Sequence, residues 1–196
     1  MVDIPRMIAA AIAHHRAGRV SDAQELYRQV LSVDPGNSDV LYLLGGIAYQ
    51  AQRYAEAIDC INRAITGWEQ SAPPKPPNPV AYNNLGEAYR AAGRGRDAEA
   101  CYLRALAIRP AYAEPHYHLG LVLEDDGRYQ EAIPHYRQAI SLKPDLVFAH
   151  YNLGVALKRQ GSVGEAIACF QQVLRLDPDN GMAQFRLSSL IGLNPD

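Results

Sequence analysis

The chain has 196 residues, with 19 lysines and arginines against 21 aspartates and glutamates, so its formal net charge is −2. This length suits one compact domain or a short repeat array. Binding to nucleic acid would need a basic face or stripe, and the cations here are interleaved with acids. The longest apolar run near the N-terminus, residues 7–13, is too short to span a bilayer and has no signal-peptide flanks. We therefore expect a cytoplasmic protein that contacts neither nucleic acid nor membrane.

One alanine recurs along the chain at a nearly constant interval. It occurs at Ala23, Ala57, Ala98, Ala132 and Ala166, with steps of 34 residues three times and 41 residues once. A glycine or alanine stands twelve positions before each of them. A period in this range indicates a repeat architecture. Stacked repeats build a long binding surface rather than a closed catalytic pocket.

Each repeat carries two helical patterns, and the third repeat shows them most plainly. Tyr82, Leu85 and Tyr89 have the spacing of an amphipathic helix, two glycines follow, and Ala98 and Tyr102 belong to a second helix. A small residue in each helix lets two antiparallel helices approach closely, while bulky neighbours fill the remaining space. The fourth and fifth repeats show the same order of residues.

These residues at these offsets resemble the tetratricopeptide repeat, most closely in residues 82–89 and 97–110. The resemblance extends over about residues 4–180. It implies an all-α fold, a right-handed superhelical solenoid of five helix-turn-helix repeats with a C-terminal capping helix. The expected boundaries are 4–37 for a divergent first repeat, 38–71, 79–112, 113–146 and 147–180 for the other four, 72–78 for a proline-rich insertion, and 181–193 for the capping helix.

The 41-residue step places the insertion after the second repeat. Residues 72–79 contain five prolines, so they cannot be helical and favour extended polyproline II. Two interpretations stay open: a stiff loop that joins two helices, or a ligand for a proline-recognising domain. We expect Trp68, the only tryptophan, to anchor the segment.

The cysteines are equivalent by position. Cys60, Cys101 and Cys169 share one repeat position, and His135 holds it in the fourth repeat. An intervening helix separates equivalent helices, so their separation exceeds what a disulfide allows. We interpret the cysteines as small hydrophobic side chains, with a redox or metal role as the alternative.

Catalytic motifs are missing from the sequence. It contains no metal-ligand spacing, no glycine-rich phosphate loop and no nucleophile elbow. We predict a protein that is not an enzyme and uses no cofactor or metal.

The resemblance implies a concave groove lined by the first helix of each repeat, apolar in its N-terminal half and polar in its C-terminal half. We expect this groove to bind a peptide or a helix of a partner protein. The candidate groove residues are Tyr42, Tyr49, Asn83, Asn84, Glu87, Arg90, Tyr117, His118, Tyr151, Asn152, Lys158 and Arg159.

Asn84 and Asn152 share the sixth repeat position, and His118 holds it between them. An amide offers both a donor and an acceptor, so a row of them could hold an extended peptide by its backbone. In this respect repeats three to five are similar to those of O-linked N-acetylglucosamine transferases. The plain alternative is that these are solvated groove residues. The Lys-Asn pair of a chaperone-type carboxylate clamp is absent, which argues against such an adaptor.

Two further hypotheses concern the whole protein. The chain could be the repeat region of a larger enzyme, such as a glycosyltransferase that recruits its substrate protein. Alternatively, an apolar stripe of Ile4, Met7, Ile8 and Ile12 could make the chain a homo-oligomer, because no earlier repeat covers it. The sequence names neither the partner nor the pathway.

Overall fold

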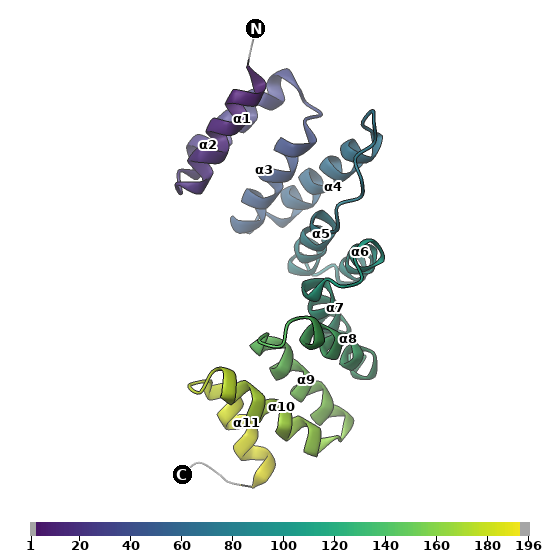
Figure 1. Ribbon diagram of the computed structural model, residues 1–196. Helices are drawn as coiled ribbons and strands as arrows, with labels where there is room; N and C mark the ends of the chain where they lie inside the picture. The colour runs from purple at the N-terminus through teal and green to yellow at the C-terminus, as the bar shows by residue number, and fades with distance from the viewer. Residues whose placement is uncertain (1–2, 193–196) are drawn as a thin grey trace. The chain divides into compact units, whose positions relative to one another are not determined.

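The computed structural model describes residues 3–192, and every regular element in this range is an α-helix. The chain forms two compact units, an N-terminal unit of residues 1–101 and a C-terminal unit of residues 102–196, which divide within α6. The helices, labelled in Figure 1, are α1 (Ile4–Arg16), α2 (Val20–Val33), α3 (Ser38–Gln50), α4 (Tyr54–Gln70), α5 (Pro79–Ala91), α6 (Gly95–Ile108), α7 (Ala113–Asp125), α8 (Tyr129–Leu142), α9 (Val147–Gln160), α10 (Val163–Leu176) and α11 (Gly181–Ile191).

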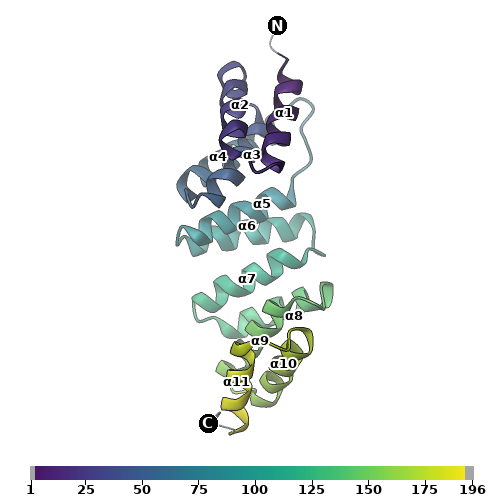
Figure 2. The ribbon, with the colours of Figure 1, turned by 90° about the vertical axis from the view of Figure 1, so that its left-hand side faces the viewer.

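The predicted all-α fold of paired helices is confirmed. In the N-terminal unit α1 packs on α2 and α3 on α4, and in the C-terminal unit α7 packs on α8 and α9 on α10. Figures 1 and 2 both show α11 beside α10, where it packs as a cap on the last pair. Residue 193 of the predicted capping helix lies outside the described residues, and the exact repeat boundaries stay predictions.

Close approach within a pair depends on a glycine that faces a large buried side chain. A Cβ added at Gly120 would lie 2.5 Å from Cε1 of Tyr136, and one added at Gly45 would lie 2.6 Å from Cγ1 of Ile61. Tyr136 is completely buried and Ile61 is 1% exposed, so neither can move aside. These contacts explain why the repeat needs a small residue in its first helix and a bulky one in its second.

Local signals set the helix ends. The side chains of Asn37, Asn78 and Asn180 accept hydrogen bonds from backbone N–H groups in the first turns of α3, α5 and α11. Most turns within a pair place a glycine in the left-handed region, but Gln52 adopts φ 58° in the turn between α3 and α4. That backbone conformation is less favourable for a residue with a Cβ. The turn of the second repeat therefore keeps its shape without a glycine, at a local cost in conformational energy.

The N-terminal apolar stripe is covered in part by its own unit. Ile4, Met7, Ile8 and Ile12 pack against a buried cluster that includes Tyr27. All four are intermediate in exposure rather than fully exposed.

The proline-rich insertion is fastened to the helices before it. The Trp68 indole N–H donates to Asp39 Oδ1 at 2.7 Å, and Lys75 Nζ lies 3.2 Å from the same oxygen and 5.9 Å from the centre of the indole ring. The backbone N–H of Lys75 also donates to the carbonyl of Trp68 at 3.0 Å. These contacts confirm that Trp68 anchors the segment, while residues 72–77 remain exposed.

Two adjacent glycines of α3 give a matched test of the packing argument. We expect Gly45→Ala to lower the free energy of unfolding by about 1–3 kcal/mol, because its Cβ would overlap Ile61 in a packed core. Gly46 has no atom within 4 Å of an added Cβ, so Gly46→Ala should raise stability by about 0.5–1 kcal/mol through helix propensity.

Urea denaturation followed by circular dichroism measures both changes. Equal effects of the two substitutions would show that close helix packing at Gly45 does not limit stability.

Candidate functional site

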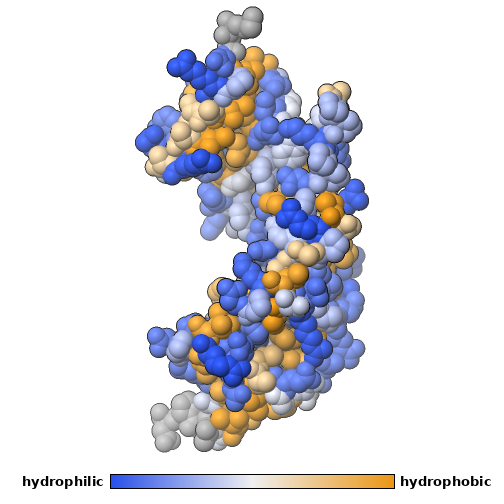
Figure 3. All heavy atoms as spheres, viewed as in Figure 1, coloured by the Kyte–Doolittle hydropathy of each residue, from blue (hydrophilic) through white to orange (hydrophobic). Residues whose placement is uncertain are grey.

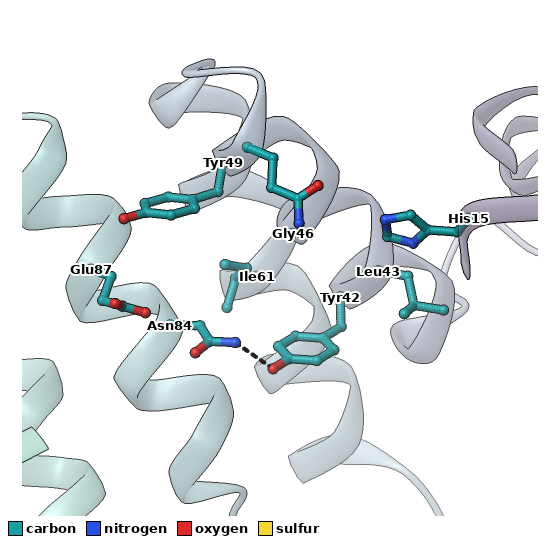
Figure 4. Close-up of a pocket in the computed structure, with 9 residues that line it drawn as sticks. His15, Tyr42, Leu43, Gly46, Tyr49, Ile61, Asn84 and Glu87 are labelled. Atoms are coloured by element: carbon teal, nitrogen blue, oxygen red, sulfur yellow. Dashed lines mark hydrogen bonds between the residues drawn. The ribbon is translucent and has the colours of Figure 1, made fainter. Parts of the chain in front are cut away.

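A hollow of about 230 Å³ opens on the N-terminal unit where α3 meets α5. Figure 4 shows that Tyr42, Gly46 and Tyr49 of α3 and Asn84 and Glu87 of α5 surround it. The remaining lining residues come from α1, α3 and α4 and are His15, Leu43, Gln50 and Ile61. The hollow therefore brings together Tyr42, Tyr49, Asn84 and Glu87, four of the residues expected from the sequence.

A hydrogen bond fixes one wall of the hollow. The amide nitrogen of Asn84 donates to the hydroxyl of Tyr42 at 2.7 Å, which joins α5 to α3 (Figure 4). The Tyr42 ring in turn packs against Trp68, with ring centres 5.4 Å apart. The amide of Asn84 has a second N–H, which is not engaged by Tyr42.

The opposite side of the hollow carries a neutral tyrosine beside charged groups. Burial raises the pKa of Tyr49, Glu87 raises it further, and Arg90 lowers it. Tyr49 is thus a neutral phenol at physiological pH and is able to donate a hydrogen bond next to the Glu87 carboxylate. Arg90, another expected groove residue, is exposed and lies near enough to influence this phenol.

Size and chemistry together limit what this hollow can hold. Small-molecule pockets commonly occupy about 300–1,000 Å³, so a hollow of about 230 Å³ suits one apolar side chain better than a whole metabolite. Leu43 and Ile61 supply apolar contact, and the tyrosine, amide and carboxylate groups at the rim can bond a peptide backbone.

Asn83 differs from the expectation that it lines a groove. Its side chain is only 4% exposed. Its amide nitrogen lies 3.4 Å from both Asn84 Oδ1 and Glu87 Oε2. Asn83 therefore serves packing and orients two lining residues rather than offering itself to solvent.

The C-terminal unit repeats the link between neighbouring first helices. The amide nitrogen of Asn152 on α9 donates to the hydroxyl of Tyr117 on α7 at 3.3 Å, as Asn84 does to Tyr42. Arg186 on α11 donates from Nε to the hydroxyl of Tyr151 at 3.3 Å. In each case the sixth residue of one helix bonds a tyrosine at the fifth position of the preceding first helix. His118 also contacts the Tyr117 ring edge to face, with centres 5.4 Å apart.

Lys158 and Arg159 line a separate hollow of about 370 Å³, together with Val155 and Arg186. Arg186 is not among the groove residues that the sequence predicts, because residues 181–193 indicate only a capping helix. The signal was available, since Arg186 holds the sixth position of its helix, as Asn84 and Asn152 do in theirs.

All three cysteines are buried or partly buried. All three are free thiols, and burial is the main cause that raises the pKa of Cys101 to about 12 and that of Cys169 to about 11. A protonated thiol is a poor nucleophile and a poor metal ligand. Among residues 3–192, no group of three or more His, Cys, Asp or Glu side chains could hold a metal ion.

His135, which holds the cysteine position of the fourth repeat, contacts His116 on the neighbouring helix. His116 Nδ1 and His135 Nδ1 lie 3.2 Å apart, and the rings stack with centres 5.5 Å apart. His116 Nε2 lies 3.1 Å from the carbonyl oxygen of Pro110. Burial lowers the pKa of His116, although the bond to Pro110 opposes this. One of the two Nδ1 atoms must donate the hydrogen bond and the other must accept it. The two Nδ1 atoms therefore cannot both carry a proton while this bond is made.

The helix pairs define an all-helical repeat protein. Tetratricopeptide repeat models match residues 7–41, 38–111, 80–145 and 147–180. The chain belongs to the tetratricopeptide repeat family. No helix in the described part of the chain is both long and apolar enough to cross a membrane.

Several known proteins are similar to this chain. A crystal structure of MamA is 26% identical, with 91% of this chain and 94% of that chain covered and a TM-score of 0.77. YrrB, described as a TPR protein with an unusual peptide-binding site, is 20% identical, with 94% and 91% covered and a TM-score of 0.79. The peroxisomal targeting signal receptor of Candida albicans (strain SC5314 / ATCC MYA-2876) is 25% identical over 101 residues, which are 50% of this chain and 16% of the receptor.

Burial of His116 should make the stability of the C-terminal unit depend on pH. The pKa of His116 is lower in the folded chain than in the unfolded chain, so the unfolded chain binds protons at higher pH. Stability should be fully present above the ordinary histidine pKa of about 6.5 and should fall as the pH drops below it.

Urea denaturation between pH 7.5 and 5.5 measures this loss, and His116→Gln should reduce its slope. His135→Cys introduces the residue of the other repeats and removes the ring contact but not the burial of His116, so an intermediate slope is expected. Identical slopes in all three proteins would assign the acid sensitivity to other groups.

Proposed function

We propose that this chain is a non-catalytic protein-interaction module that binds a peptide or helix of a partner protein. The hollow between α3 and α5 takes an apolar side chain of that ligand. The observation that carries the proposal is the arrangement of half-buried aromatic side chains and polar rim groups around an open, apolar floor.

Binding at this hollow would combine two kinds of contact. An apolar ligand side chain would cover Leu43 and Ile61 between the two tyrosine rings. The second amide N–H of Asn84 and the hydroxyl of Tyr49 would bond carbonyl groups of the ligand backbone. Each such bond contributes about 1 kcal/mol net, so affinity would come mainly from the buried side chain.

The similar proteins support this class of function. YrrB is described as having a peptide-binding site, and the name of the Candida albicans protein describes a receptor for a targeting signal. We infer by analogy that the present chain also recognises a segment of another protein. A cytoplasmic location and the absence of catalysis and cofactors are parts of this proposal.

A second candidate is that these repeats form one region of a longer protein, such as an enzyme that recruits its substrate. The match to the targeting signal receptor favours this arrangement, since it spans only 16% of that protein. The asparagine row that resembles O-linked N-acetylglucosamine transferases belongs to this hypothesis. Self-association through the N-terminal stripe is the third candidate, although those side chains already pack on their own unit.

Filling the hollow should weaken peptide binding at this site while the fold is retained. Gly46→Leu places an alkyl group where no atom lies within 4 Å of the added Cβ, so it should compete with the ligand side chain without disturbing the helix. Peptides selected from a library on the wild-type chain should lose at least tenfold in affinity, as measured by fluorescence anisotropy.

Gly164→Leu on α10 is the matched control, because Gly164 is also exposed and has no neighbour within 4 Å of an added Cβ. This variant should bind as the wild type does. Equal affinity of the Gly46→Leu variant would place the peptide elsewhere.

The asparagine row has its own test. Asn84→Ala combined with Asn152→Ala should weaken the selected peptides if these amides bond the ligand backbone. The control is Tyr42→Phe combined with Tyr117→Phe, which removes the same two internal hydrogen bonds but leaves both amides in place.

Titration calorimetry on the two double variants separates the roles. Loss of affinity only in the alanine variant is the expected result. Unchanged affinity there would exclude the asparagines from the binding site.

A further inference from the structure

Three cations meet at one hollow of the C-terminal unit. Lys158 and Arg159 from the last turn of α9 and Arg186 from the middle of α11 line it together with Val155. Within residues 3–192 none of the three forms an ion pair, whereas Arg128, Arg137 and Lys143 of the same unit pair with glutamates at 2.7–3.3 Å. Burial raises the pKa of Glu124, and Arg159 is one of the groups that oppose this increase.

The helix dipole explains only part of this cluster. Cations in the last turn of a helix are favourable by themselves, which accounts for Lys158 and Arg159. Arg186 is in neither the first nor the last turn of α11, and its Nε donates to the hydroxyl of Tyr151, which directs the guanidinium toward α9. Three like charges around one hollow repel each other, and a bound anion would relieve that repulsion.

Both helices also carry apolar side chains that are partly or fully exposed. On α9, Phe148, Tyr151, Val155 and Lys158 follow a spacing that places them on one face, so an apolar stretch leads into the basic hollow. Phe148 is 62% exposed and Phe185, next to Arg186, is 61% exposed. Figure 3 shows hydrophobic side chains at the surface over the helices at the C-terminal end of the chain.

We propose that this face of α9 and α11 binds a peptide segment in which an aspartate or glutamate side chain stands next to apolar residues. The carboxylate enters the hollow between Lys158 and Arg186, and the apolar neighbours cover Phe148 and Phe185. This inference rests on the proposed function, peptide binding, and adds a second site with a defined ligand chemistry in the other compact unit.

The mixed chemistry of the face selects this ligand over other anions. Nucleic acid or an extended anionic surface would meet a stripe of cations, but here the charge is confined to one hollow. Arginine offers a fork that suits a carboxylate, and the exposed phenylalanine rings favour a partner with apolar groups beside its charge.

The test uses the full chain and three labelled peptides of equal length. Two are blocked at both ends and carry either one aspartate or one asparagine between leucines. The third carries the asparagine and has a free C-terminal carboxylate. We expect the aspartate peptide to bind about tenfold more tightly than its asparagine partner, with an affinity that falls as salt is added.

Arg186→Gln should remove this tenfold preference. Arg175→Gln on α10 is the matched control, because Arg175 bonds Gln172 and lies outside the hollow, and it should keep the preference. Arg186→Lys retains the charge but loses the fork, so a partial preference is expected. Equal binding of the aspartate and asparagine peptides to the wild type would overturn the proposal.

Tighter binding of the peptide with the free C-terminus than of the aspartate peptide would also overturn it, since the hollow would then hold a terminal carboxylate. The Gly46→Leu variant separates this inference from the proposed function. One informative outcome is that Gly46→Leu weakens binding of library-selected peptides while Arg186→Gln leaves the aspartate preference unchanged. That result would support peptide binding at the first hollow and would exclude the second site.

Discussion

The fold depends on the contact between a small residue in one helix and a large buried side chain in its antiparallel neighbour. Gly45 against Ile61 and Gly120 against Tyr136 leave no room for a Cβ. This approach sets how near the two helices of a pair lie. The helix face that carries the glycine is buried in this packing, so only the other faces of the first helix remain accessible.

Hydrogen bonds also link the first helices of neighbouring repeats. Asn84 bonds Tyr42, Asn152 bonds Tyr117, and Arg186 bonds Tyr151, each from the sixth position of one helix to the fifth position of another. Asn84 lines the hollow of the N-terminal unit, and Arg186 lines the basic hollow of the C-terminal unit. A residue that couples neighbouring helices is thus held in one orientation, and an ordered amide or guanidinium loses less entropy when it binds a ligand.

The two hollows differ in chemistry although they arise from equivalent helices. The hollow in the N-terminal unit has an apolar floor and a neutral phenol beside a carboxylate, whereas the hollow in the C-terminal unit gathers cations. Repeats keep the packing residues and vary those that face outward. One architecture can therefore present different side-chain chemistry at equivalent positions of successive repeats.

The sequence by itself determined the helices, their pairing and their turns, because the spacing of alanine, glycine and bulky residues reports packing between neighbours in the chain. It also indicated Tyr42, Tyr49, Asn84 and Glu87 as surface candidates. Only the tertiary structure decided that Asn83 is buried, that His116 meets His135 and that Arg186 joins Lys158. Such contacts depend on side-chain direction and on distances between separate helices, which a one-dimensional period does not encode.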